Sequence, residues 1–309
     1  MFKPSFYNKN DFPDHLPKLK ALYADLFAEG KGFRAKLVKM LTPHLDIPSE
    51  TVDSLCKAIE YIHNSSLLHD DLIDQSPLRR GKKAAWLKYS PDYAVLAGDY
   101  LLAKVIQILS RDTNLELVSY TSQTIMDLLE GEWLQDTIKK NPQINFEEID
   151  RIHELKTASL KKWCLRAPFF AINNFDPKLH SKLDELGKLM GLLFQRADDL
   201  LDYDIRNSEG KAILGDHNAG YMNSFAIYLL KDASPSKRED FMQKSTLPEI
   251  ISFIGKTEFA NAIENFDAWN NTLIDAYQAT LSEIRTLLSK EQSKICDPLT
   301  PIAKLLYWR

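Results

Sequence analysis

Two short aspartate clusters in this sequence have the residue types and spacing to bind divalent metal ions. Both have the pattern Asp-Asp-x-x-Asp, and they occupy residues 70–74 and 198–202. On a helix, residues four apart share one face, so the first and last carboxylates of each cluster would project together. Two such clusters arise by chance in about one or two of a hundred chains of this composition. The candidate metal ligands are Asp70, Asp71, Asp74, Asp198, Asp199 and Asp202.

Both clusters follow apolar residues, which argues against the alternative of a solvated acidic face. Leu67 and Leu68 precede the first cluster, and residues 191–194 precede the second. Three carboxylates on one turn of a half-buried helix repel one another unless a cation balances them. Such carboxylates suit Mg²⁺, which usually completes its octahedron with substrate phosphate oxygens. Arg79 and Arg80 can hold phosphate in bidentate fashion, so these residues together indicate a diphosphate substrate.

The elements that carry these clusters are predicted to be helices. The chain has only 11 glycines in 309 residues, about half the average usage, and it is rich in residues that favour helices. Helix starts are indicated at Ser90-Pro91, Asp176-Pro177 and Ser234-Pro235, and by capping-box spacing at Asn145/Glu148 and Thr246/Glu249. Apolar periodicity predicts helices at 14–28, 33–45, 49–74, 92–111, 115–140, 146–172, 178–205, 219–231 and 257–288. We therefore expect residues 14–309 to form one all-α domain after a loosely held arm at residues 1–13.

Charge and hydropathy exclude several other classes of protein. The formal net charge is −4, from 39 basic and 43 acidic residues, so a nucleic-acid partner is not expected. No apolar run approaches the roughly eighteen residues of a membrane span, and the N-terminal residues lack the apolar core of a signal peptide. The three cysteines, Cys56, Cys164 and Cys296, have neither metal-ligand nor disulfide spacing. The expected location is therefore cytoplasmic.

Further motifs occur in the order typical of one enzyme family. From about Gly30 to about Asn223, the chain resembles the trans-isoprenyl diphosphate synthases of the polyprenyl synthetase family. The two aspartate clusters match the two aspartate motifs of that family. The other matching motifs are Gly30-Lys31-x-x-Arg34, His63, Arg79-Arg80-Gly81, Gly98-Asp99-Tyr100-Leu101-Leu102, Gly131-Glu132-x-Leu134-Gln135, Lys156-Thr157 and Phe194-Gln195.

The resemblance implies a fold, a reaction and a site. The fold would be the isoprenoid synthase type I fold, a single large helical bundle around a central apolar cavity, and the protein would be a homodimer. The two aspartate motifs would face each other across the mouth of the cavity and bind Mg²⁺, three ions per active site with diphosphate. An allylic diphosphate would ionise, isopentenyl diphosphate would attack the cation, and loss of a proton would give a longer allylic diphosphate. The resemblance assigns Arg79, Lys156, Thr157 and Gln195 to the allylic diphosphate, and Lys31, Arg34, His63 and Arg80 to isopentenyl diphosphate.

Product length is expected to depend on residues upstream of Asp70, because one helical turn of about 5.4 Å approximates one isoprene unit. Ser66 and Ser65 lie four and five residues before Asp70, where short-chain enzymes of the family often have aromatic residues. Small serines would leave the tunnel open at this level, so we expect geranylgeranyl diphosphate or a longer product. Ile62 and Ile59 are candidates for a deeper floor, although core packing explains them equally well.

Three places depart from the family pattern. Glu29 replaces a glycine and Ala35 a proline in the early motif, which changes the loop but keeps its charged residues. Arg196 stands where an aliphatic residue is commoner, and it is a candidate phosphate or carboxylate partner. Tyr221 stands where a diphosphate-binding lysine is expected, so the allylic site would lack one cation unless Arg196 or Lys211 compensates.

Three other functions remain open from the sequence. A class I terpene cyclase would share the fold, but it needs no isopentenyl diphosphate site and usually has a different second metal motif. A metal-dependent phosphohydrolase using His63, His69 and Asp70 would leave the second cluster unexplained. A non-catalytic subunit that modulates a partner synthase would fit the change at Tyr221, although such subunits tend to lose aspartates and none is lost here.

Overall fold

The computed structural model describes residues 9–28, 32–79, 81–112, 114–203 and 213–308, most of them in helices. The predicted all-α class is therefore confirmed. The described residues of 1–125 and 163–177 form one compact unit, here called the first unit. Those of 126–162 and 178–309 form the second unit. The single domain expected for residues 14–309 stays a prediction.

The first unit is helical apart from one short hairpin. Its helices are η1 (Lys9–Asp11), α1 (Pro17–Ala28), α2 (Phe33–Leu41), η2 (Thr42–His44), α3 (Ser49–Ile73), α4 (Ala85–Lys88), α5 (Pro91–Leu109), η3 (Ser110–Asp112), the start of α6 (Leu115–Thr137) and the end of α8 (Ser159–Ala171). The hairpin pairs β1 (Leu78–Arg79) with β2 (Lys82–Lys83) in antiparallel fashion. This hairpin was not predicted from the sequence; its turn includes Gly81 at a φ of 75°, which favours glycine.

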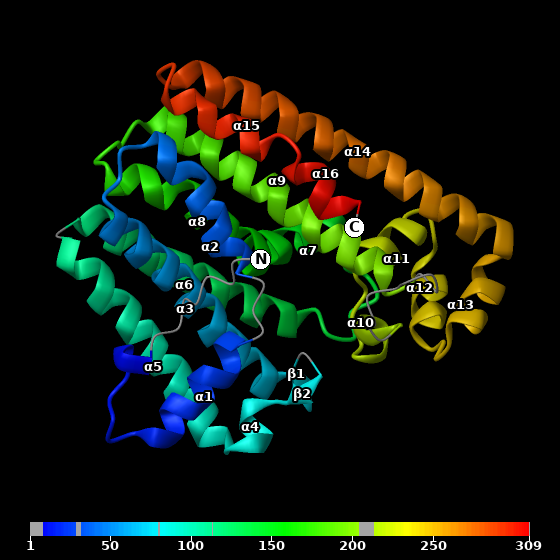
Figure 1. Cartoon of the computed structure of the whole chain (residues 1–309). Helices are drawn as coiled ribbons and strands as arrows, with labels where there is room; N and C mark the ends of the chain where they lie inside the picture. Colours follow the sequence, from blue (N-terminus) through cyan, green and yellow to red (C-terminus); the bar gives the residue numbers. More distant parts are fainter. Residues whose placement is uncertain (1–8, 29–31, 80, 113, 204–212, 309) are drawn as a thin grey trace. The chain divides into compact units, whose positions relative to one another are not determined.

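The second unit contains the remaining helices. They are the rest of α6, α7 (Phe146–His153), the π-helical turn η4 (Glu154–Ala158), the start of α8 (Ser159–Ala171), α9 (Pro177–Leu201), α10 (Gly215–Asn218), α11 (Ser224–Leu229), α12 (Pro235–Met242), α13 (Leu247–Ile254), α14 (Lys256–Leu287), η5 (Gln292–Ile295), α15 (Cys296–Leu299) and α16 (Ile302–Tyr307). Within this unit, the long helix α14 runs alongside α15 and α16 (Figure 1).

Side-chain caps form at both predicted capping-box sites. At the start of α7, Asn145 Oδ1 accepts a hydrogen bond from Glu148 N, and Glu148 Oε2 accepts one from Asn145 N. At the start of α13, Thr246 Oγ1 accepts from Glu249 N, but the Glu249 carboxylate accepts from Ser245 N. The second site is therefore a capped start in which the return bond comes from one residue earlier than predicted.

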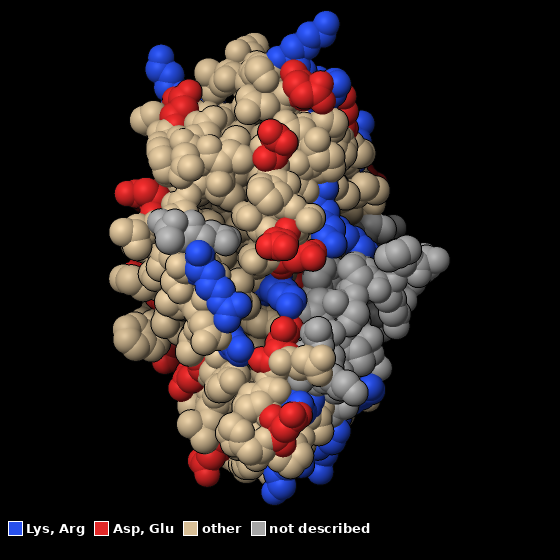
Figure 2. All heavy atoms as spheres, turned by 60° about the vertical axis from the view of Figure 1, so that its left-hand side comes forward, with Lys and Arg blue, Asp and Glu red and all other residues tan. Residues whose placement is uncertain are grey.

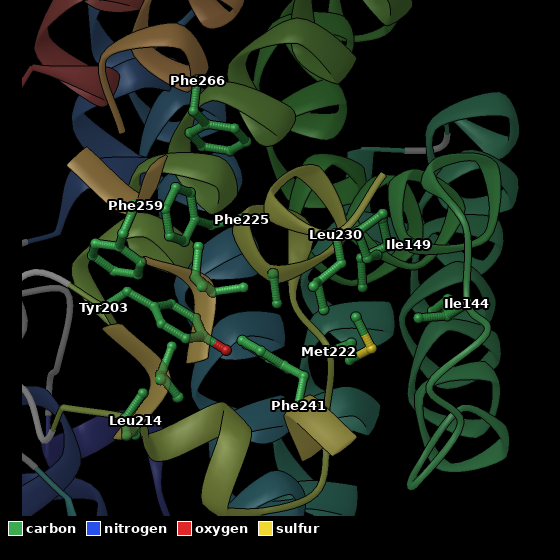
Figure 3. Packing of buried hydrophobic residues seen from close by; sticks show 14 of the residues in the cluster. Ile144, Ile149, Tyr203, Leu214, Met222, Phe225, Leu230, Phe241, Phe259 and Phe266 are labelled. Atoms are coloured by element: carbon green, nitrogen blue, oxygen red, sulfur yellow. The ribbon is translucent and has the colours of Figure 1, made fainter. Parts of the chain in front are cut away.

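The core of the second unit is a cluster of aromatic and aliphatic side chains (Figure 3). The ring centroid of Phe225 lies 5.3 Å from that of Tyr203, 5.9 Å from Phe259 and 5.4 Å from Phe266. Such tilted and edge-to-face pairs contribute about 0.5–1.5 kcal/mol each beyond their burial. Because Tyr203 directly follows Asp202, this core fixes the end of the second aspartate cluster.

Glycines bring α9 against the helix formed by η4 and α8 in the second unit. A Cβ on Gly191 would lie 2.2 Å from Ala158 Cβ, and one on Gly187 would lie 2.7 Å from Lys162 Cα. Both distances are too short for real atoms, so the contact requires glycine at these positions. The close approach places the π-helical turn η4 beside the part of α9 that leads into the second cluster.

A similar close contact orders the end of α3 in the first unit. A Cβ on Gly98 of α5 would lie 2.2 Å from His69 Nε2, so α5 approaches α3 closely at this point. Ser65 Oγ of α3 donates a hydrogen bond to Gly98 O at 2.9 Å. The turn of α3 that carries the first cluster is therefore fixed from one side by α5.

The surface shown in Figure 2 carries interspersed charges of both signs. Lysine and arginine side chains alternate there with aspartates and glutamates among uncharged residues, so this face presents no extended field of one sign. Over the described part of the chain, no helix combines the length and the apolar character needed to cross a membrane.

Replacing Gly191 with alanine tests the contact between η4 and α9. Alanine is favoured over glycine in a helix by about 1 kcal/mol, so an unhindered site would become more stable. Because the new Cβ meets Ala158, we expect Gly191→Ala to lower the free energy of unfolding by about 1–3 kcal/mol. Ser181→Ala, at an exposed position of α9, is the control in denaturant titrations. A stabilised Gly191→Ala variant would contradict the contact.

Candidate active site

The first aspartate cluster lies at the C-terminal end of α3. Asp71 is buried, and its two carboxylate oxygens share the Nε–H of Arg79 at N···O distances of 2.9 and 3.1 Å, while Oδ1 also accepts from Nη2. Asp70 is partly exposed, and Asp74, the C-cap of the helix, is exposed. Asp70 and Asp74 are therefore the carboxylates of this cluster that an ion can reach from solvent, whereas Asp71 holds Arg79 in place.

The second cluster lies at the C-terminal end of α9 and also contains both buried and partly exposed aspartates. Asp199 is 1% exposed and accepts hydrogen bonds from Ser224 N at 2.9 Å, Ser224 Oγ at 2.6 Å and Gln195 Nε2 at 3.0 Å. Asp202 is fully buried and accepts from the backbone N–H groups of Gly215 and Asp216 at 2.7 and 3.2 Å. Asp198 is the partly exposed carboxylate of this cluster.

Both clusters stand where a helix is least able to accommodate negative charge. The C-terminal end of a helix carries a partial negative charge, which makes each nearby carboxylate unfavourable by about 0.3–1 kcal/mol. Repulsion among the carboxylates of each cluster adds to this cost. A bound divalent cation would relieve both effects at each cluster, so the donor sets and their placement fit Mg²⁺.

Protein side chains alone do not complete a metal site. Among the described residues, no group of three or more His, Cys, Asp or Glu side chains is arranged to hold an ion. Mg²⁺ usually binds through one or two carboxylates, with waters and substrate phosphates as its other ligands. The reachable carboxylates Asp70, Asp74 and Asp198 are consistent with that mode of binding.

A cavity of about 180 Å³ in the second unit brings together several predicted site residues. Lys156 and Thr157 of η4 and Gln195 and Asp199 of α9 all line it. Thr157 Oγ1 donates a hydrogen bond to Gln195 Oε1 at 3.0 Å, and Gln195 in turn donates to Asp199. These two consecutive hydrogen bonds, from Thr157 to Gln195 and from Gln195 to Asp199, fix the orientation of the Gln195 amide.

His153 also lines this cavity and was not predicted from the sequence as a site residue. Its Nε2 lies 3.6 Å from Asp199 Oδ2. Burial lowers the pKa of His153 to about 4, so the imidazole is neutral at pH 7. Burial also raises the pKa of Asp199, although the hydrogen bonds from Ser224 and Gln195 oppose this shift. His153 stands three residues before Lys156, at a spacing that carries no sequence signal of its own.

Two of the departures from the family pattern have different surroundings. Tyr221 lines the 180 Å³ cavity, and Lys139 Nζ lies 5.8 Å from the centre of its ring. Arg196 is buried and donates to both Asp150 carboxylate oxygens at 3.0 and 2.7 Å, with its guanidinium 4.1 Å from the Trp269 ring. Of the two roles considered for Arg196, the structure therefore supports the carboxylate partner. Lys211 lies outside the described residues.

The residues predicted for isopentenyl diphosphate are only partly described. Lys31 and Arg80 lie outside the described residues. Arg34, near the start of α2, and His63, on α3, belong to the first unit and are both partly exposed. Their assignment to this substrate stays a prediction.

The residues predicted to set product length belong to the packed part of α3. Ile59 and Ile62 are completely buried, and Ser66 Oγ donates to His63 O at 3.0 Å. A cavity of about 280 Å³ beside the first cluster is lined by a neighbouring face of α3, through Asn64, Leu67 and Asp71, and by Arg79. The tunnel role of Ser65, Ser66, Ile62 and Ile59 stays a prediction.

Comparison with known proteins shows the family of this chain. Residues 16–250 match the polyprenyl synthetase family. A prenyl transferase of Cyanidium caldarium is 31% identical over 291 residues, covering 90% of this chain and 85% of the relative. A farnesyl diphosphate synthase of Buchnera aphidicola is 30% identical over 257 residues, covering 78% of this chain and 89% of the relative.

Solved structures establish the fold in the same way. The decaprenyl diphosphate synthase of Rhodobacter capsulatus superposes with a TM-score of 0.84 at 24% identity, covering 97% of this chain and 93% of that chain. The heptaprenyl diphosphate synthase of Staphylococcus aureus gives a TM-score of 0.81 at 24% identity, covering 97% and 94%. The expected isoprenoid synthase type I fold is thus confirmed. The chain belongs to the polyprenyl synthetase family and is a transferase of prenyl groups.

Proposed function

We propose that this chain condenses isopentenyl diphosphate with an allylic diphosphate of the geranyl or farnesyl type. The observation that carries the proposal concerns the helices α3 and α9. Each ends in a cluster of three carboxylates, and each cluster has near it an arginine or lysine side chain of the kind that binds diphosphate. Arg79 lies against the first cluster, and Lys156 lines the cavity beside the second. This arrangement suits an anionic substrate that arrives with divalent cations.

The six aspartates divide into two roles in this proposal. Asp70, Asp74 and Asp198 are reachable and serve as Mg²⁺ ligands. Asp71, Asp199 and Asp202 are buried and act as supports, for Arg79, for Gln195 and for the chain at Gly215 respectively. Bound Mg²⁺ would neutralise the charge that develops on the leaving diphosphate; three ions per active site is the number expected from the family.

The remaining polar residues orient the two substrates. Arg79, Lys156, Thr157 and Gln195 bind and align the allylic diphosphate, while Lys31, Arg34, His63 and Arg80 bind isopentenyl diphosphate. Holding the two reactants in one geometry lowers the entropic cost of their reaction. Apolar surroundings keep water from the allylic cation, so that the alkene is the nucleophile that reaches it.

Removing Asp70 tests whether the chain is itself the catalyst. We expect Asp70→Ala to lower kcat/KM for condensation at least about a hundredfold, because a metal ligand at the leaving diphosphate is lost. Asp53→Ala, an exposed position on the same helix, should retain activity. Removal of Mg²⁺ with EDTA should abolish turnover in the wild type, and added Mg²⁺ should restore it. Unchanged turnover of Asp70→Ala, or an effect confined to binding of a partner synthase, would favour the modulatory-subunit alternative.

The length of the product is predicted to be twenty carbons or more. Mass spectrometry of reactions with excess isopentenyl diphosphate should show geranylgeranyl diphosphate or longer products. Ser66→Phe, which places an aromatic side chain one turn before Asp70, should shorten the product relative to the wild type. Ser54→Phe on the same helix is the matched control. A wild-type reaction that stops at fifteen carbons would overturn the prediction, and a cyclised hydrocarbon product would indicate the terpene cyclase instead.

We further propose that the protein is a cytoplasmic homodimer that uses a stripe on α6. Met126, Leu129 and Trp133 share one face of this helix and are 51%, 50% and 78% exposed. Large apolar side chains grouped on one surface commonly mark an interface, and a second copy of the chain presents the same stripe.

Light scattering of the purified protein tests this assembly. The wild type should have twice the mass of one chain, and Trp133→Glu should shift the equilibrium towards the monomer because it places a charge in the apolar stripe. Leu305→Glu makes the same kind of change at an exposed apolar residue of α16, outside the stripe, and should leave the mass unchanged. A wild type that is monomeric at micromolar concentration would exclude the dimer.

A further inference from the structure

Lys156 is held between two side chains of α6 that no part of the proposed mechanism uses. Its Nζ forms an ion pair with Glu132 Oε2 and donates a hydrogen bond to Gln135 Oε1 at 2.9 Å. Glu132 and Gln135 are the charged and polar members of the Gly131-Glu132-x-Leu134-Gln135 motif. All three residues belong to the second unit. The structure therefore gives this motif a physical partner.

The backbone geometry makes the contact between α6 and Lys156 obligatory. A Cβ on Gly131 would lie 2.7 Å from Lys156 Cγ and 2.9 Å from Lys156 N, so only glycine lets α6 come this close. Lys156 itself lies in the π-helical turn η4, in which Ser159 N bonds to Glu154 O, five residues earlier. Such turns are rare in proteins as a whole, but where they occur they are often part of a functional site. The close contact at Gly131 and the π-helical turn together fix the position of Lys156 against α6.

The position of the ammonium group links this contact to the cavity. Lys156 and Gln135 both line the 180 Å³ cavity. The side chains of Lys156 and Glu132 are only 20% and 13% exposed, so solvent screens their interaction weakly. An anion that enters the cavity must therefore share Lys156 with the carboxylate of Glu132.

We propose that Glu132 and Gln135 are positioning residues that fix the Lys156 ammonium at the cavity wall, and that Glu132 moderates its attraction for diphosphate. The inference rests on the proposed function, because it takes Lys156 as a ligand of the allylic diphosphate. A weaker attraction between Lys156 and diphosphate helps the product diphosphate to leave. The same cation that holds the substrate diphosphate also holds the diphosphate that leaves, so an unmoderated lysine would retain this product.

Binding of inorganic diphosphate with Mg²⁺ measures this moderation without any turnover. Glu132→Gln keeps the shape and an oxygen acceptor but removes the competing charge. We expect its dissociation constant for Mg²⁺-diphosphate, measured by calorimetric titration, to fall about three- to tenfold. In elongation assays, KM for the allylic substrate should fall in parallel, while KM for isopentenyl diphosphate should change less than twofold. A purely structural role would not tighten binding.

Two further variants and one background sharpen the result. Glu132→Asp keeps the charge and should bind Mg²⁺-diphosphate within about twofold of the wild type. Glu130→Gln, an exposed carboxylate on the same helix, should leave the dissociation constant unchanged. In a Lys156→Met background, adding Glu132→Gln should gain less than twofold, because the lysine through which Glu132 acts is absent.

Each outcome decides between the alternatives. An unchanged or weaker affinity in Glu132→Gln, or an equal gain in the Lys156→Met background, would overturn the positioning role. If the wild type does not elongate any allylic diphosphate but the diphosphate titrations behave as expected, the proposed reaction fails while the role of Glu132 stands. If the wild type elongates and Glu132→Gln binds diphosphate as the wild type does, the proposed reaction stands while the role of Glu132 fails.

Discussion

Burial of carboxylates is the physical constraint on which the rest of the site depends. A carboxylate withdrawn from water is costly unless it is paired or accepts hydrogen bonds. Three of the six aspartates meet this demand in different ways. Asp71 pairs with Arg79, Asp199 accepts from Ser224 and Gln195, and Asp202 accepts from two backbone N–H groups. Each solution also fixes a neighbouring part of the chain.

The buried aspartates thereby order the residues that are left to meet the substrate. The ion pair with Asp71 holds the guanidinium of Arg79 beside α3. The hydrogen bond to Asp199 orients the amide of Gln195, which in turn accepts a hydrogen bond from Thr157. The polar groups of the site are thus placed before any ligand arrives. Preorganised donors of this kind are the main source of electrostatic stabilisation in enzymes, because they need not reorganise as charge develops.

Periodicity and local chemistry made the helices and the clusters predictable. The stretches 49–74 and 178–205 correspond to α3 and α9 within four residues at each end, because long apolar periodicity and a proline at the start of α9 are local signals. Features that depend on distant partners were not predictable. The pairing of Arg196 with Asp150 joins residues that are 46 positions apart, and no pattern in the sequence around Arg196 indicates it. The support that Glu132 gives to Lys156 depends likewise on a π-helical turn that no local pattern encodes.

The contact between Gly191 and Ala158 has an evolutionary consequence. A Cβ at position 191 would meet not only the methyl group of Ala158 but also its backbone, at 2.5 Å from Cα and 2.9 Å from N, so even glycine at 158 would not make room for it. Among related chains, a larger residue at 191 should therefore occur only where the backbones of η4 and α9 lie farther apart. A chimaera that joins the η4 segment of one relative to the α9 of another would combine segments whose spacing had never been selected together.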